Sequence, residues 1–191
     1  MKKILLILCF GMLVSTLSAQ VKPVYFIGDS LTKDSTKATL YGVFGKLDAE
    51  NLYVLKVYDF YDNLISSGTF KDDSLKVPHG KFSYYDSVYE FNEENGTYYY
   101  LKDKDRFLSE QGSFNNGFKT GRWISFYPDG KFFTIVNYVN GLKQGEYKKF
   151  DRKGRTLVEG QYLLDLEDGT WKFGKYKLVN FVEGRVRSAT N

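Results

Sequence analysis

Residues 114–130, Phe-Asn-Asn-Gly-Phe-Lys-Thr-Gly-Arg-Trp-Ile-Ser-Phe-Tyr-Pro-Asp-Gly, decide the fold, because their pattern returns 24 positions later in residues 138–154. The same step links several columns of glycine and aromatic residues: Gly117 with Gly141; Gly121, Gly145 and Gly169; Trp123, Tyr147 and Trp171; Phe114, Tyr138 and Tyr162; Phe126 with Phe150; Gly130 with Gly154. A fixed period in this range is typical of repeat arrays, in which each unit buries its apolar face against its neighbours.

Each unit has the pattern of two strands and two turns. Residues 115–117 (Asn-Asn-Gly) predict a tight turn, since Asn and Gly tolerate positive φ. Residues 121–127 predict a strand, 128–130 (Pro-Asp-Gly) a second turn, and 131–138 the returning strand. The sequence therefore predicts an all-β fold, an antiparallel meander of repeated β-hairpins that forms an elongated, twisted single sheet.

The repeat weakens toward the N-terminus. Residues 53–70 and 68–85 retain hairpin features, and residues 89–108 predict a further hairpin with turns at 94–96 and 103–105. Apolar residues at helical spacing are not evident after Gln20, so no helix is expected. We divide the chain into residues 1–19, a lead-in at 20–52 with short strands at 24–27 and 39–44, and a repeat domain at 53–191.

The first residues resemble a secretory signal peptide. Lys2 and Lys3 precede an apolar run at 4–17, and Ser18-Ala19 supplies small residues for cleavage. This predicts export to the periplasm or the cell surface, with an uncleaved membrane anchor as the alternative. Cys9, the single cysteine, lies within this run, so the mature chain would contain neither a disulfide nor a thiolate metal site.

The charge of the mature chain is close to balanced. Removal of Lys2 and Lys3 reduces the 27 basic residues to 25, against 23 acidic residues, so the net charge falls from +4 to +2. This balance argues against nucleic acid as a partner. Lys148 and Lys149, followed by Arg152 and Lys153, form the best basic patch for a lipid headgroup, but the favoured interpretation of these residues is a solvated strand and turn.

The pattern Tyr/Phe-x-Asn-Gly-x-x-x-Gly-x-Trp/Tyr, followed by an aromatic residue and a Gly turn, resembles the variant MORN repeat. The closest resemblance is to exported bacterial members of the YwqK-type antitoxin family, and it covers residues 53–184. This resemblance implies a β-hairpin scaffold with a binding role. It also implies two narrower alternatives: inhibition of a partner toxin, or recognition of lipid headgroups.

One motif suggests catalysis. Residues 26–32 (Phe-Ile-Gly-Asp-Ser-Leu-Thr) resemble the nucleophile block of GDSL-type esterases, with Ser30 as the nucleophile. A serine nucleophile needs a histidine base that a carboxylate orients. The single histidine, His79, lies in a predicted turn at 77–80 without the Asp-x-x-His element of that family. We therefore predict a non-enzymatic protein with no catalytic, cofactor or metal site.

The exposed aromatic residues of the repeat are the candidate contacts for a protein partner, whose identity the sequence does not reveal. These candidates are Trp123, Tyr127, Tyr147 and Trp171, with Lys148 and Lys149 beside them. Strand alternation places Trp123, Tyr147 and Trp171 in one cross-strand column, so a purely structural ladder is the competing role. The sequence leaves the oligomeric state open.

Overall fold

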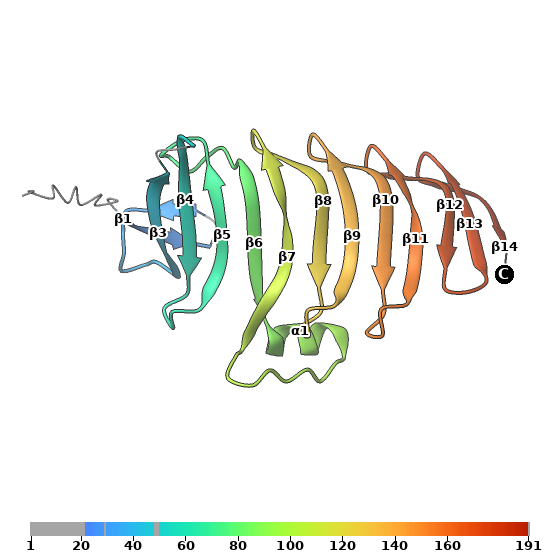
Figure 1. The fold of residues 1–191 in the computed structure, drawn as a ribbon, viewed down its shortest axis with the longest axis horizontal. Coiled ribbons are helices and arrows are strands. Elements are labelled where there is room, and N and C mark those ends of the chain that lie inside the picture. The colour runs from blue at the N-terminus through green and yellow to red at the C-terminus, as the bar shows by residue number, and fades with distance from the viewer. Residues whose placement is uncertain (1–21, 29, 48–49, 191) are drawn as a thin grey trace, which may run out of the picture.

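The computed structural model describes residues 22–28, 30–47 and 50–190. They form one sheet and one helix (Figure 1). The elements are β1 (Lys22–Ile27), β2 (Ser30–Thr32), β3 (Leu40–Leu47), β4 (Leu52–Tyr58), β5 (Leu64–Phe70), β6 (Gly80–Ser87), α1 (Val88–Asn95), β7 (Arg106–Asn115), β8 (Phe118–Phe126), β9 (Phe132–Val139), β10 (Leu142–Phe150), β11 (Thr156–Leu163), β12 (Leu166–Phe173), β13 (Lys177–Val182) and β14 (Arg185–Thr190). The predicted signal at 1–19 and Cys9 lie outside the described residues.

The 14 strands pair antiparallel in the order β14 through β3, then β1 and β2. Each strand from β3 onward lies beside its sequence neighbour, whereas β1 lies between β3 and β2. The sheet is open, long and twisted (Figure 1), which confirms the predicted meander of hairpins. Within the described ranges, no helix has the length and apolar character needed to cross a bilayer.

Four turns along the upper edge of the sheet in Figure 1, from the β7–β8 turn onward, share one backbone conformation. In each, two adjacent residues have φ between 50° and 89°, as in the type I′ hairpin turn, whose twist matches that of the strands. The four pairs are Asn116-Gly117, Asn140-Gly141, Leu164-Asp165 and Glu183-Gly184. The predicted turns at 115–117 and 140–141 are therefore confirmed.

These turns also connect successive hairpins. In each, the amide of the second turn residue donates a hydrogen bond to a carbonyl of the preceding hairpin, at 2.8–3.0 Å. The pairs are Gly117 with Pro78, Gly141 with Lys119, Asp165 with Lys143, and Gly184 with Glu167. The 24-residue period spaces the donors at 117, 141 and 165 and the acceptors at 119, 143 and 167, whereas the acceptor Pro78 and the donor Gly184 lie outside that period.

The third of these turns, Leu164-Asp165, has the residue types least compatible with positive φ. Leu164 has φ of 52°, where a branched L-residue is strained by about 1–2 kcal/mol and Asn is tolerated. We expect Leu164→Asn to raise the free energy of unfolding by roughly 0.5–1 kcal/mol in urea melts. Asp165 stays unchanged in this variant, since its Oδ1 accepts from the Lys143 amide at 2.7 Å.

Leu163→Asn is the matched control for this substitution. Leu163 is the neighbouring exposed leucine, but it lies at the end of β11 with an ordinary strand conformation. Asn at that position should lower stability, because strands disfavour it. Equal effects of the two substitutions would contradict the backbone explanation.

One face of the sheet carries the core, and we call it the ladder face. Phe26, Leu55, Val57, Phe70, Phe82 and Trp123 form its buried cluster. Three central strand glycines make room for large rings, since a Cβ on Gly68, Gly112 or Gly160 would lie 2.1–2.2 Å from Phe82, Trp123 or Trp171 respectively. The aromatic side chains therefore lie flat over the neighbouring backbone and bury themselves without a second sheet.

The predicted hairpin at 89–108 is wrong, because its first half is helix α1. Ser87 caps the helix by accepting from the Glu90 amide at 3.3 Å, and Gly96 ends it with φ of 58°. Val88 and Phe91 are its buried residues. The Ser-x-x-Glu pair is a helix-start pattern that the sequence analysis overlooked in favour of the hairpin period.

Two boundaries also differ from expectation. Residues 30–32 form the short strand β2, paired with β1, in addition to the strands predicted at 24–27 and 39–44. The repeat strands begin immediately after each upper turn rather than at Gly121, Gly145 and Gly169. These three glycines have φ of 63–89° within strands whose pairing shifts register around them, so they form bulges inside the strands.

Candidate protein-interaction surface

The ladder residues that the sequence offered as partner contacts lie largely inside the protein. Trp123 and Trp171 are only 1% and 3% exposed, and Tyr127 is also buried. Tyr147 stacks on Trp171 with ring centroids 5.3 Å apart. Each indole nitrogen donates to a carbonyl of the preceding strand, Ser113 or Gln161, at 3.1 Å. The burial and hydrogen bonding support the structural role for this column.

Lys148 and Lys149 do not form one basic patch. As neighbours in β10 they point to opposite faces of the sheet. Lys148 pairs with Glu146 at 2.5 Å, and this carboxylate, through its hydrogen bond and charge, raises the pKa of the lysine. The Lys149 ammonium lies 5.0 Å from the centroid of the Phe133 ring. Neither arrangement concentrates positive charge for an anionic headgroup.

Ser30 and His79 are not brought together. Ser30 lies on β2, whereas His79 precedes β6, and β1, β3, β4 and β5 separate these two strands in the sheet. The imidazole Nδ1 accepts a hydrogen bond from the Asn116 amide at 3.3 Å. This contact makes the histidine part of the upper turn region, remote from Ser30.

The feature that interrupts the repeat is the segment at 88–105, which we call the insertion. It occupies a place on the lower edge where the other hairpins have short turns, and it projects below the sheet in Figure 1. Its inner side packs on the sheet through Val88, Phe91, Phe107 and Tyr127. The Tyr127 hydroxyl donates to the Phe150 carbonyl at 2.8 Å. The insertion therefore packs against the next hairpin through Tyr127, and Tyr127 in turn links that hairpin to the one after it.

Asn92 fixes the extended part of the insertion. Its Nδ2 donates to the Tyr99 carbonyl at 2.9 Å, and its Oδ1 accepts from the Tyr99 amide at 2.8 Å. The same oxygen accepts from the Thr97 hydroxyl at 2.8 Å. The Asn92 side chain thus fixes residues 97–99 through hydrogen bonds to the Thr97 hydroxyl and to the Tyr99 backbone amide and carbonyl.

This arrangement turns alternate tyrosines outward. Tyr98 and Tyr100 are 96% and 84% exposed, while Tyr99 between them packs against the Phe91 and Tyr127 rings. Tyr89 on α1 is also largely exposed. Tyrosines on a fixed backbone lose little conformational entropy on binding, which makes them effective protein contacts.

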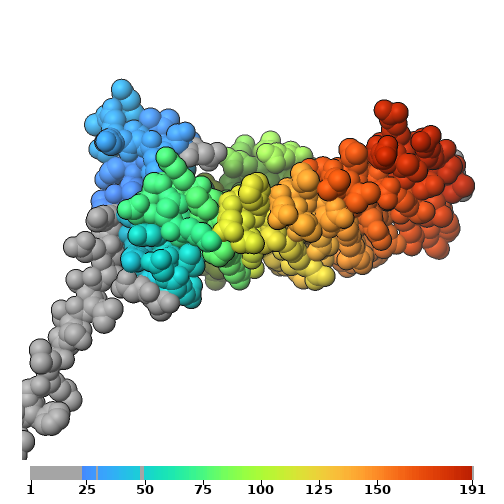
Figure 2. Space-filling model, turned by 90° about the horizontal axis from the view of Figure 1, so that it is seen from above, coloured from blue at the N-terminus to red at the C-terminus, as the bar shows by residue number. Residues whose placement is uncertain are grey.

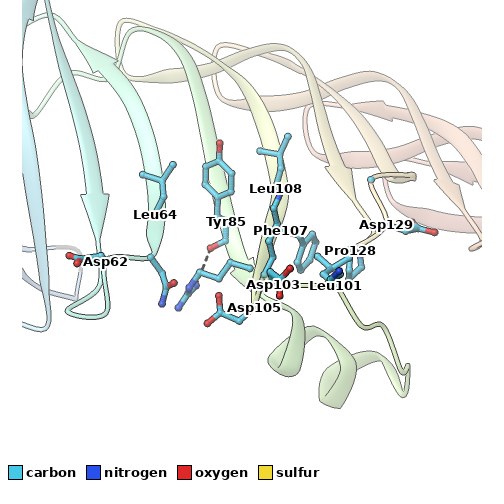
Figure 3. A pocket seen from close by; sticks show the side chains of 15 residues that line it. Asp62, Leu64, Tyr85, Leu101, Asp103, Asp105, Phe107, Leu108, Pro128 and Asp129 are labelled. Atoms are coloured by element: carbon cyan, nitrogen blue, oxygen red, sulfur yellow. Dashed lines mark hydrogen bonds between the residues drawn. The ribbon is translucent and has the colours of Figure 1, made fainter.

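A groove of about 810 Å³ adjoins the insertion (Figure 3). It lies between the turn at Asp62 and the turn at Pro128 and Asp129, with Tyr85 and Leu108 on its floor and residues 101–105 along one side. Four aspartates and three basic residues line it. This mixed charge and open shape suit a polar protein segment better than a small apolar ligand.

Arg106, which lines the groove, forms an ion pair with Asp59 beside it. Arg106 donates from Nη1 to the Tyr85 carbonyl at 3.2 Å (dashed in Figure 3), and its Nη2 lies 3.4 Å from Asp59 Oδ2. Asp59 also accepts from the amides of Tyr61 and Asn63, each at 2.9 Å. Burial opposes ionisation of the Asp59 carboxyl, but hydrogen bonds from Asn63 and Tyr61 and the Arg106 charge lower its pKa overall.

A lowered carboxyl pKa predicts sensitivity to acid. The stability that Asp59 contributes is present above its unfolded-state pKa of about 3.9 and is lost as the pH falls through its lower folded-state value. We expect Asp59→Asn to reduce stability at pH 7 and to flatten the fall in stability below pH 4, measured by urea melts. Asp73→Asn, in an exposed turn, is the control. A parallel pH profile for Asp59→Asn and the parent protein would contradict this assignment.

Sequence patterns did not predict the insertion, the role of Asn92 or the outward tyrosines, because residues 89–108 have the features of another hairpin. The alternating Tyr98-Tyr99-Tyr100 run carried no period that marked it out. No protein-family model and no curated protein matches this chain.

Proposed function

We propose that this protein is an exported, non-enzymatic scaffold of the variant MORN type, which binds a protein partner through the insertion and the adjoining groove. One observation carries the proposal: Tyr98 and Tyr100 stand almost fully exposed on a backbone that Asn92 fixes. Large aromatic side chains are costly to leave in water and are enriched at the centres of protein interfaces. The start of the sequence supports export.

The test compares partner capture by matched variants. The tagged mature chain, Gln20 to Asn191, is incubated with the native envelope fraction, and bound proteins are identified by mass spectrometry. We expect one stoichiometric partner, with affinity reduced at least tenfold by Tyr98→Ala with Tyr100→Ala. Tyr176→Ala, a similarly exposed tyrosine near the C-terminus, should leave capture unchanged.

Other outcomes of the capture experiment, and of assays for lipid binding and ester hydrolysis, would favour a different function. Equal capture by the parent and the double variant would refute the insertion as the binding surface. A partner that is a toxin, and that loses its toxicity in the complex, would establish the narrower antitoxin role. Flotation with anionic vesicles in place of a protein partner would favour headgroup recognition. Hydrolysis of short esters that Ser30→Ala abolishes would refute the non-enzymatic assignment.

A further inference from the structure

The face opposite the ladder has an exposed apolar border along the upper turns, which we call the rim. Strand alternation places six of its side chains on this face, and a seventh lies at a turn tip. The rim consists of Phe118, Val139, Leu142, Leu163, Leu164, Leu166 and Val182. It extends over β8 to β13, roughly 24 Å at the usual strand spacing. Figure 2 looks down on this edge of the long body.

The two ends of the rim carry different features, an exposed aromatic ring at one and a hollow at the other. Phe118, at the β8 end, is 57% exposed. At the β12 end, a hollow of about 390 Å³ is lined by Leu163, Leu164 and Leu166, with the charged residues Asp168, Glu183 and Arg185 at its side. β10 lies midway between β8 and β12 in the sheet, with two strand steps to each. A twofold axis at Leu142 on β10 would therefore bring each Phe118 to the hollow of the other copy.

The charges beside the rim follow the same symmetry. Arg122 on β8 and Asp168 on β12 lie on the same face as the rim. Neither takes part in an ion pair within the described part of the chain. The twofold arrangement would place Arg122 of each copy near Asp168 of the other, forming two equivalent pairs. Parallel stacking of two rims would instead leave both charges without partners.

We propose that a second copy of this chain binds the rim about a twofold axis at Leu142, with Phe118 of each copy in the hollow of the other. An isologous contact of this kind uses one surface twice and closes the assembly at a dimer. The rim is narrow compared with stable interfaces, which bury roughly 800 Å² per partner, so a weak dimer that dissociates in the micromolar range is expected. The insertion lies on the other edge, so the dimer leaves it free (Figure 1).

Sedimentation velocity of the mature chain from about 1 to 200 µM tests the dimer. The parent protein should shift from monomer to dimer across this range, and Phe118→Ser should raise the dissociation constant at least tenfold. Phe132→Ser is the matched control, since Phe132 is 49% exposed but lies near the lower edge. It should leave association unchanged once thermal melts show that both variants are folded.

Charge reversal provides a test that does not depend on removing apolar side chains. Arg122→Asp alone and Asp168→Arg alone should each weaken the dimer roughly fivefold, and the double variant should restore it. A parent protein that stays monomeric at 200 µM would overturn the proposal, as would a dimer that Phe118→Ser leaves intact. Failure of the double variant to restore association would overturn the twofold register. Binding of a monomeric parent protein to vesicles would reassign the rim to a lipid surface.

Discussion

Replacement of Gly112 by alanine is expected to lower the free energy of unfolding by about 3 kcal/mol or more, because overpacking a rigid core forces side chains and backbone to move. The new Cβ would lie 2.1 Å from Trp123 Cδ2 and 2.3 Å from Cε2. The indole cannot swing aside, since Tyr84, Phe114 and Tyr138 surround it. Urea melts followed by far-UV circular dichroism would measure the effect.

Two controls separate this clash from the backbone preferences of glycine. Gly121→Ala introduces a Cβ with no atom within 4 Å, but at φ of 63°, so it should cost only about 1–2 kcal/mol. In a Trp123→Leu background the clash is relieved, so Gly112→Ala should cost much less there. Additive effects of the two substitutions would contradict the direct contact, since residues that touch show coupling energies of about 0.5–3 kcal/mol.

The second large effect is expected for Trp123→Ala, at about 3–5 kcal/mol, the usual cost of removing a fully buried aromatic side chain. Trp123 links the buried cluster of β1 to β6 with the aromatic rings of β7 to β9. Lys119 covers its outer side, with the ammonium 3.7 Å from the ring centroid. Removal of the Trp123 indole would also remove the hydrogen bond that its nitrogen donates to the Ser113 carbonyl.

Trp171→Ala is the matched comparison, because the same kind of ring lies in the unit near the C-terminal end of the sheet. Units in a repeat array contact mainly their neighbours, so damage near one end can unfold locally. We expect Trp171→Ala to increase amide exchange in β11 to β14 while β3 to β8 stay protected. Trp123→Ala should instead increase exchange throughout the sheet. Identical exchange patterns would show that the array unfolds as one cooperative unit.

The repeat region was largely predictable from the sequence, because its determinants are local. Asn-Gly pairs at 116–117 and 140–141 set turns through their tolerance of positive φ. The 24-residue recurrence then fixes the strand order. Because each turn is short, every strand pairs with the strand that precedes it in the sequence. The Leu164-Asp165 turn has no such composition, and its place follows from the period alone.

The insertion and the rim were not predictable in this way. Helix α1 depends on packing of Val88 and Phe91 against Phe107 and Tyr127, which are distant in sequence. The outward direction of Tyr98 and Tyr100 depends on hydrogen bonds between the Asn92 side chain on the helix and the backbone of Tyr99. The assignment of Trp123 and Trp171 as candidate contacts likewise required knowledge of burial, which depends on Gly112 and Gly160 in adjacent strands.

The sequence by itself determined the fold class, the direction of the chain through the sheet and the positions of the tight turns, because backbone preferences and side-chain alternation act over a few residues. Only the tertiary structure decided which aromatic residues are buried and which face water. That outcome depends on neighbouring strands: glycines in one strand accept the rings of the next, and the inserted helix covers one group of aromatic side chains while exposing another. The surfaces available for binding are what remains after this packing is complete.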